Sequence, residues 1–157
     1  MLSIKRNDFV VDIIGDGSDK KNLENKAIEM GLGNQVIFHG FKQKEELPAF
    51  FAQTDCFLFQ TGFDIWGLVL NEAMAAGLPC IVSPNAGAVD DLIKDGENGY
   101  ICKFTEPDKV ITLINDLLDD TDKAHRISLA ASSFIQSNAS IPKSTEGFLK
   151  AIHYCKV

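Results

Sequence analysis

The sequence predicts an α/β fold in which helices cover a parallel sheet on both faces. Apolar runs of strand length alternate with amphipathic segments of helix length along most of the 157 residues. The apolar runs are nearly continuous, which is typical of strands buried on both faces. Glycines follow several of the strands and helices, and they mark the turns between them. Strands separated by helices indicate a Rossmann-like parallel sheet.

The strands are predicted at residues 9–15, 35–40, 56–60, 79–83 and 99–104. The helices between them are predicted at residues 19–30, 44–53, 67–76 and 86–94, and helices at 107–119, 122–137 and 143–154 follow. We expect a single domain over residues 1–157, because this length suits one core. Ligands of such sheets bind beyond the carboxyl ends of the strands, so the loops of interest are those at 15–18, 40–43, 60–67, 83–88 and 103–107.

The composition excludes several classes of protein. A net charge of -7 and a pI near 4.9 argue against nucleic-acid binding, which needs a basic face. These values do not exclude a nucleotide ligand, because one diphosphate needs only local amide donors and a few cations. No apolar run approaches the roughly 20 residues that span a bilayer, so no transmembrane segment is expected. The N-terminus lacks the apolar stretch of a signal peptide.

The four cysteines, Cys56, Cys80, Cys102 and Cys155, form no CxxC pair. The three histidines, at positions 39, 125 and 153, have no ligand spacing with them, so no metal site is expected. We therefore interpret the cysteines as buried free thiols in a reducing compartment.

The first candidate for chemistry is the segment GDGS at 15–18, which follows a predicted strand. Gly15 and Gly17 would allow a tight turn and a close approach of the backbone to a ligand. The segment is neither GxGxxG nor a P-loop. A plain turn into a helix, with Ser18 or Asp19 as the N-cap, explains it at least as well.

The second candidate is the segment DIWGLVLNEAMAAG at 64–77. Gly67 lies at the predicted start of a helix, where free amides and the helix dipole favour an anion such as a diphosphate. Glu72 lies on an otherwise apolar helix, and ribose hydroxyls would be suitable donors to its carboxylate. The alternative interpretation is that Glu72 faces water and that Asp64 is an ordinary acidic residue of the loop, with no ligand to bind. The physical chemistry alone leaves both interpretations open.

The order of the motifs resembles the C-terminal domain of family 4 retaining glycosyltransferases, which have the two-domain GT-B fold. That family has a strand ending in G-D-G, then V-x-F-x-G, then an acidic residue separated by seven residues from the Glu of E-A-M-A-x-G-x-P. The corresponding segments here are IIGDG (13–17), VIFHG (36–40), Asp64 to Glu72, and EAMAAGLP (72–79). GAVDDLI (87–93) and DGENGYI (95–101) follow in the family's order, and the resemblance covers residues 9–120.

The resemblance implies roles for the residues of the second candidate segment. Glu72 would bind the ribose of the donor nucleotide, and Asp64, where the family usually has Glu, would contact hydroxyls of the donor sugar. Gly67 and Leu68 would offer backbone amides to the distal phosphate. Trp66 replaces a common Phe and is expected to serve in packing.

Phe41 and Lys42 follow VIFHG, where family members hold the nucleobase, and we add Gly15 and Gly17 to the donor-binding candidates. The family generally needs no metal, so no cofactor is expected beyond a UDP- or GDP-linked sugar as the substrate.

Two parts of the family pattern are absent from this sequence. These are the first strand, with its Gly-Arg and downstream Lys, and the N-terminal domain that carries the acceptor site. We therefore expect an N-terminally truncated domain that works with a missing domain or a partner chain. The gap left by the first strand would be closed by direct strand pairing, by a partner, or by exchange between copies, since an open interior edge would aggregate.

The implied function is retaining transfer of a hexosyl group from a nucleotide sugar to a glycan or lipid-linked acceptor, in polysaccharide biosynthesis. The implied location is the cytoplasm, with peripheral attachment to the inner membrane in the complete enzyme. The alternative is a non-catalytic module that binds the nucleotide sugar and needs a separate acceptor domain. A receiver-like domain fits less well, since Asp16 alone does not make its acidic cluster. An epimerase with the GT-B fold is a further alternative. It fits less well, because it would share the fold but not the motif that runs from Asp64 to Glu72.

Overall fold

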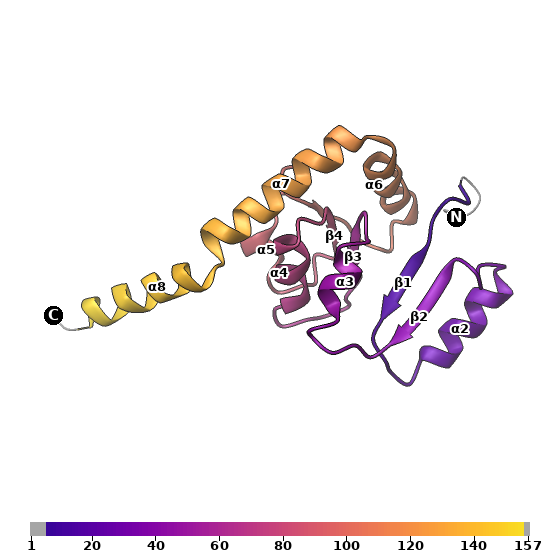
Figure 1. The fold of residues 1–157 in the computed structure, drawn as a ribbon, viewed down its shortest axis with the longest axis horizontal. Helices are drawn as coiled ribbons and strands as arrows, with labels where there is room; N and C mark the ends of the chain where they lie inside the picture. The colour runs from indigo at the N-terminus through magenta and orange to yellow at the C-terminus, as the bar shows by residue number, and fades with distance from the viewer. Residues whose placement is uncertain (1–5, 156–157) are drawn as a thin grey trace. The chain divides into compact units, whose positions relative to one another are not determined.

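The computed structural model describes residues 6–155 of the chain (Figure 1). The described residues up to Phe50 form one compact unit, and those from Phe51 onward form a second. The expectation of a single domain stays a prediction.

The first unit is a parallel strand–helix–strand arrangement. Strand β1 (Val11–Ile14) leads through helix α2 (Lys20–Glu29) into β2 (Val36–Gly40), and Val11 pairs with Val36. Parallel pairing of this kind requires a crossover, which α2 supplies. Two apolar residues of α2 are largely exposed: Leu23 and Ile28 retain 46% and 67% of their accessible surface. Of the residues in α2, Ala27 is buried.

The second unit contains a three-stranded parallel sheet in the order β3–β4–β5. The strands are β3 (Phe57–Phe59), β4 (Cys80–Val82) and β5 (Tyr100–Ile101). The helices are α4 (Leu68–Ala75), α5 (Val89–Leu92), α6 (Pro107–Asp119), α7 (Thr121–Asn138) and α8 (Ile141–Tyr154). A further short helix, α3 (Leu47–Phe51), precedes β3. The predicted α/β class with parallel strands is confirmed.

The core of the second unit lies on both faces of β4, whose residues are all buried. Cys80 and Val82 belong to one hydrophobic cluster and Ile81 to another, as the alternation of side chains along a strand requires. The first cluster contains buried residues of α4, α5 and α7, and the second contains residues of α6 and α7. Helices therefore cover both faces of this sheet, as the continuous apolar runs predicted.

Helix α5 is shorter than predicted. It begins at Val89, whereas the sequence pattern suggested a helix from residue 86. The residues just before α5 are held against the loop after β3, because the amides of Gly87 and Ala88 donate to the carbonyls of Asp64 and Trp66.

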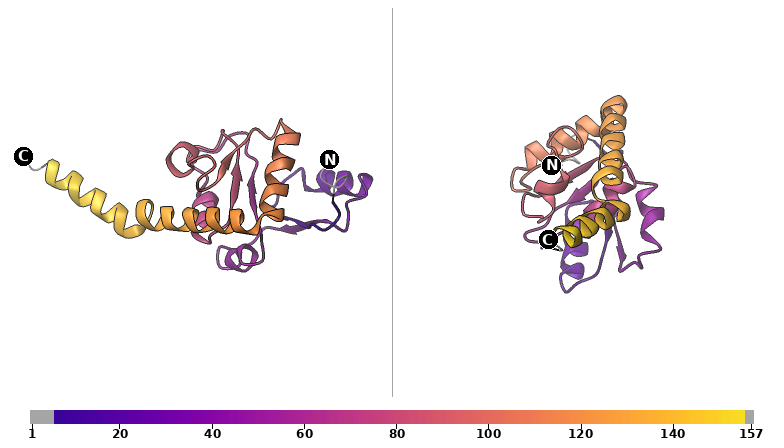
Figure 2. Two further views of the ribbon diagram at one scale, coloured as in Figure 1. Left: turned by 90° about the horizontal axis from the view of Figure 1, so that it is seen from above. Right: turned by 90° about the vertical axis from the view of Figure 1, so that its left-hand side faces the viewer.

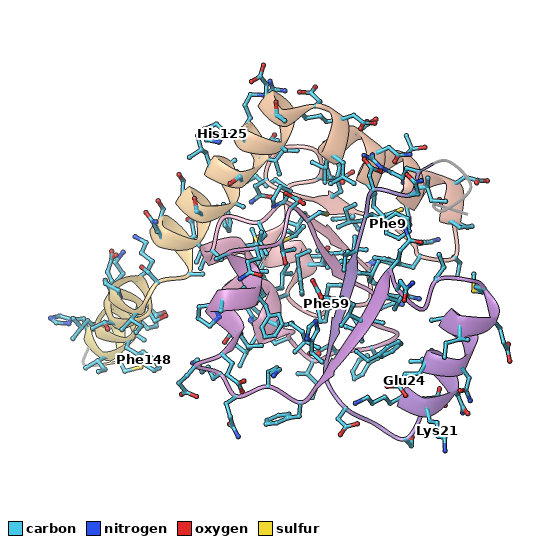
Figure 3. The ribbon with its side chains drawn as sticks, turned by 45° about the vertical axis from the view of Figure 1, so that its right-hand side comes forward. Phe9, Lys21, Glu24, Phe59, His125 and Phe148 are labelled. Atoms are coloured by element: carbon cyan, nitrogen blue, oxygen red, sulfur yellow. The ribbon has the colours of Figure 1, made fainter. Side chains whose placement is uncertain are left out.

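Helix α8 projects away from α7 (Figure 2). All its described residues are exposed, including Ile141, Phe148, Leu149 and Ile152, which form an apolar stripe. Figure 3 labels Phe148, which keeps 73% of its surface exposed. Among the described residues, no helix is both long enough and apolar enough to cross a membrane.

Asn98 holds together the turn that the sequence shows as DGENGY. Its side chain is 3% exposed, accepts a hydrogen bond of 2.7 Å from the Lys94 amide and donates one of 3.0 Å to the Leu92 carbonyl. Removing the side chain leaves two backbone groups without their partner. We expect Asn98→Ala to lower the free energy of unfolding by about 2–3 kcal/mol, measured by urea denaturation. Asn22→Ala, at an exposed asparagine, should change it by less than about 0.5 kcal/mol.

The cysteines are all free, but they differ in exposure. Cys80 and Cys102 are buried as expected, whereas Cys56 is only partly buried and Cys155 is exposed, which corrects the prediction that these thiols are buried. Burial raises the pKa of Cys56 to about 12 and that of Cys80 well above its usual value. A disulfide reagent at pH 8 should therefore label Cys155 quickly and the other thiols only after unfolding, because the thiolate is the reacting form. Fast labelling of a folded Cys155→Ser variant would contradict this.

Candidate donor-binding site

The turn between β3 and α4 depends on a glycine at position 67. Gly67 is the N-cap of α4 and has φ of 86°, in the left-handed region that favours glycine. A Cβ at this position would lie 2.6 Å from Cε1 of Phe59, the last residue of β3. A side chain at residue 67 would therefore strain the turn from the strand into the helix.

Helix α4 is fixed by its buried face and open at its N-terminus. Leu70, Ala73 and Met74 are fully buried in the core. No side chain of the described residues caps the helix start, and Leu68 is 71% exposed, so the first amides remain available to an anion. The sequence prediction of Gly67 and Leu68 at an uncapped helix N-terminus is consistent with this geometry, while their role in binding stays a prediction.

Glu72 lies on α4, one turn beyond its start, and is partly exposed rather than buried. Within residues 6–155 its carboxylate has no hydrogen bond or ion pair. A half-buried carboxylate on a mostly apolar helix is available to accept hydrogen bonds from hydroxyl groups. This geometry is compatible with the ribose-binding role implied by the family resemblance, which stays a prediction.

Asp64 is held in a defined orientation within the loop. One carboxylate oxygen, Oδ1, accepts a hydrogen bond of 3.0 Å from the Trp66 amide, as in an Asx turn. The Trp66 ring in turn donates from Nε1 to Oδ1 of Asn71 on α4, at 2.9 Å. Trp66 therefore ties the loop to the helix, which refines the expectation that it serves in packing.

The loop is also joined to the segment after β4 through its backbone. The Asp64 amide donates to the Asn85 carbonyl at 3.3 Å, and the Gly87 amide donates to the Asp64 carbonyl at 2.9 Å. A third bond, of 3.0 Å, runs from the Ala88 amide to the Trp66 carbonyl. Asp64 thus has a fixed main chain as well as an oriented side chain.

The glycines of GDGS lie in the first unit. Gly15 has φ of 138° and donates from its amide to the Gly40 carbonyl at 2.9 Å, so it joins the ends of β1 and β2. The Gly17 amide donates to Oδ1 of Asp16 at 2.9 Å. Asp19 occupies the N-cap position of α2 but makes no side-chain cap bond. A turn into the helix is confirmed, and ligand binding by Gly15 and Gly17 stays a prediction.

Phe41 and Lys42 follow β2 in the same unit. Phe41 is 68% exposed, which leaves its ring available for stacking. The Lys42 ammonium lies 3.4 Å from a carboxylate oxygen of Glu46 and 5.7 Å from the centre of the Phe50 ring. Glu46 also accepts the Gln43 amide at 2.8 Å, so Lys42 belongs to a local network at the start of the next helix.

The charges of the candidate site are acidic. No Lys or Arg occurs between positions 60 and 77, so the loop and α4 offer an anion amides but no cation. Among residues 6–155, no three His, Cys, Asp or Glu side chains converge as metal ligands. A shallow hollow of about 480 Å³ is lined by Trp66 and Asn71 among others, but by neither Asp64 nor Glu72.

Three residues that matter for this geometry have no role assigned by the sequence patterns. Phe59 contacts Gly67, Asn71 holds the Trp66 ring, and Gly87 lies against the loop. Gly87 was visible as the first residue of GAVDDLI, but spacing gives no sign of what its Cβ would meet. Phe59 reads in the sequence as an ordinary apolar strand residue.

The chain is similar to proteins that transfer sugars. It is 30% identical over 138 residues to a GDP-mannose-dependent alpha-(1-6)-phosphatidylinositol monomannoside mannosyltransferase of Mycolicibacterium smegmatis, which covers 83% of this chain and 36% of the relative. It is 32% identical to a sulfoquinovosyl transferase of Arabidopsis thaliana, over 77% of this chain and 23% of that one. The chain therefore spans about a third or less of the length of these relatives.

Solved structures show the same fold. The C-terminal domain of a glycosyl transferase group 1 family protein from Francisella tularensis has a TM-score of 0.79 and 26% identity, over 89% of this chain and 75% of that one. Anabaena HepE in complex with UDP and glucose has a TM-score of 0.81 and 24% identity, over 92% of this chain and 40% of that one. The predicted C-terminal GT-B fold is thereby confirmed.

The family model described as "Glycosyl transferases group 1" matches residues 1–134. Because that match covers most of the chain, this protein belongs to the group 1 glycosyl transferases.

Proposed function

We propose that this chain binds the nucleotide-sugar donor of a retaining hexosyltransferase whose acceptor is a glycan or a lipid-linked glycan. The observation that carries the proposal is the junction of β3 and α4. There, among residues 6–155, a helix N-terminus without a side-chain cap, the oriented carboxylate of Asp64 and a Glu72 carboxylate without a partner occur within one continuous segment. Support for the donor class comes from the M. smegmatis relative, described as GDP-mannose-dependent, and from HepE, which was crystallised with UDP and glucose.

The chemistry follows from where charge develops in the reaction. When the bond from the sugar to the distal phosphate breaks, the nucleoside diphosphate leaves with added negative charge. The amides of Gly67 and Leu68 would stabilise that charge, because the helix N-terminus is preorganised and needs no rearrangement. Glu72 would accept hydrogen bonds from the ribose, and Asp64 would accept them from the donor sugar. We further propose that Gly15, Gly17, Phe41 and Lys42 contribute to nucleotide binding.

One observation favours a second candidate, a module that binds the nucleotide sugar without catalysing transfer. Because no Lys or Arg lies between positions 60 and 77, the segment itself supplies no cation for the leaving diphosphate. Electrostatic stabilisation by amides alone supports binding, but a fast transfer reaction benefits from a positive charge at the phosphate.

Calorimetric titration with UDP and GDP, followed by an assay of donor hydrolysis, separates these candidates. Binding together with turnover supports the transferase, binding without turnover supports the module, and no binding of either nucleotide rejects both. Because we propose that the site needs no metal ion, a chelator such as EDTA should leave the nucleotide affinity unchanged. A loss of affinity that added Mg²⁺ restores would contradict this part of the proposal. The cytoplasmic location stays a prediction from the family resemblance.

A further inference from the structure

The loop that holds Asp64 lies directly against the backbone of Gly87. Two hydrogen bonds connect the loop to this segment. The Gly87 amide donates to the Asp64 carbonyl, and the Ala88 amide donates to the Trp66 carbonyl. The two segments also form an isolated parallel bridge between Asp64 and Ala86. The bonds use main-chain atoms only, so the loop is positioned by how closely the two backbones approach.

That approach is possible only because residue 87 has no side chain. A Cβ on Gly87 would lie 1.9 Å from the Ile65 carbonyl oxygen, 2.6 Å from its carbonyl carbon and 3.0 Å from the Asp64 carbonyl oxygen. These are backbone atoms, which cannot rotate away as the end of a flexible side chain would. Gly87 does not have a positive φ, so glycine is required here for space and not for backbone conformation.

A side chain at position 87 would therefore displace residues 64–66 but would leave α4 in place. The helix is held by Leu70, Ala73 and Met74, all fully buried, and its N-cap glycine packs on Phe59. Asp64 depends on the loop instead, because its carboxylate is oriented by the Trp66 amide. The loop that is proposed to contact the sugar and the helix that is proposed to contact the diphosphate would therefore respond differently to a substitution of Gly87.

We propose that Gly87 is a positioning residue that sets the place of Asp64 and thereby favours the sugar-carrying donor over the bare nucleoside diphosphate. This inference rests on the proposed function, because it assumes that Asp64 faces the sugar and that α4 faces the diphosphate. Gly87 acts through the loop and touches no ligand itself.

The test compares Gly87→Ala with two other glycine variants. Gly62→Ala changes the same loop at a position where a Cβ meets no atom within 4 Å. Gly99→Ala crowds Ile93 and the Cys80 carbonyl, so it reports general destabilisation away from the loop. Amide hydrogen exchange is measured on the ligand-free chain, and affinities for UDP, GDP and their glucose and mannose conjugates are measured by calorimetry.

In Gly87→Ala, we expect the Ala88 amide to exchange at least about tenfold faster, because its bond to the Trp66 carbonyl is lost. We expect the affinity for the nucleotide sugar to fall about tenfold. The affinity for the nucleoside diphosphate should fall less, by about twofold to threefold, because the Gly67 amide shares the displaced Trp66 peptide group whereas the Leu68 amide stays with α4. Where the wild type catalyses transfer, turnover should fall by about 100-fold, as for a misplacement of about 1 Å. The Gly62→Ala variant should match the wild type in each measurement.

Unchanged exchange of the Ala88 amide in Gly87→Ala would overturn the inference, and so would equal loss of affinity for both ligands. If the Ala88 amide exchanges faster in Gly87→Ala but the wild-type chain binds no nucleotide, the proposed function is rejected. That result would confirm only the steric role of Gly87. If Gly87→Ala does not fold, the double variant Gly87→Ala with Ile65→Gly is tested in its place. The single variant Ile65→Gly is then the control. The Ile65 side chain is 84% exposed, so its loss removes little packing and lets the carbonyl move away from the new Cβ.

Discussion

Glu72→Ala is expected to lower kcat/KM for sugar transfer by about 100-fold in the enzyme that contains this chain. The carboxylate is partly exposed and has no hydrogen bond or ion pair within residues 6–155. It therefore contributes little to the stability of the fold. Its removal should therefore leave the free energy of unfolding within about 0.5 kcal/mol of the wild-type value. Steady-state kinetics and urea denaturation of the same preparation measure the two effects.

Glu97→Ala is the matched control for Glu72→Ala, since Glu97 is an exposed acid in the turn before β5. It removes the same charge from the protein and should leave the kinetics unchanged. Wild-type kinetics in Glu72→Ala would contradict the ribose-binding role. A large loss of stability in Glu72→Ala would show that the carboxylate serves the fold, which would contradict the assignment in a different way.

Gly67→Ala is expected to have the largest combined effect on stability and binding. Alanine at φ of 86° is strained, and its Cβ would lie 2.6 Å from the Phe59 ring. Together these effects should lower the free energy of unfolding by about 2 kcal/mol or more. Because the same change tilts or unwinds the start of α4, the affinity for the nucleoside diphosphate should fall at least about tenfold.

Two variants separate the causes of the Gly67→Ala effect. Gly62→Ala inserts the same methyl group five residues earlier in open space, and it should be neutral in both measurements. Phe59→Leu combined with Gly67→Ala relieves the contact with the ring but not the backbone strain, so it should restore only part of the stability. Full stability and affinity in Gly67→Ala would contradict the account of this turn.

The order of strands and helices could be predicted because each apolar run is bounded by a turn signal. The run at 79–83 appears as β4 (Cys80–Val82), and its alternating burial on two faces is what a strand between neighbours requires. Helix α7 was predicted within a residue or so at each end, since its apolar spacing is long and regular. Short elements such as α5 (Val89–Leu92) were less predictable, because four residues give too little periodicity to fix where a helix begins and ends.

The candidate site was predictable where its residues adjoin in sequence. The segment from Asp64 to Glu72 forms a loop and a helix start, as its glycine and apolar pattern indicated. Its supports could not be predicted, because they come from Phe59 on the preceding strand and Gly87 beyond the next one. Nor did the pattern show that α8 would expose its apolar stripe, since amphipathic spacing predicts a helix but not what covers it.

The central claim is that the uncapped start of α4 and the carboxylate of Glu72 bind a nucleoside diphosphate. Titration of the isotope-labelled chain with UDP and GDP, followed by NMR of the backbone amides, tests it most directly. The account predicts saturable shifts at Gly67, Leu68 and Glu72 with at least one nucleotide, and much smaller shifts in the Glu72→Ala variant. Saturable shifts confined to other residues, or no shifts at millimolar nucleotide, would contradict it.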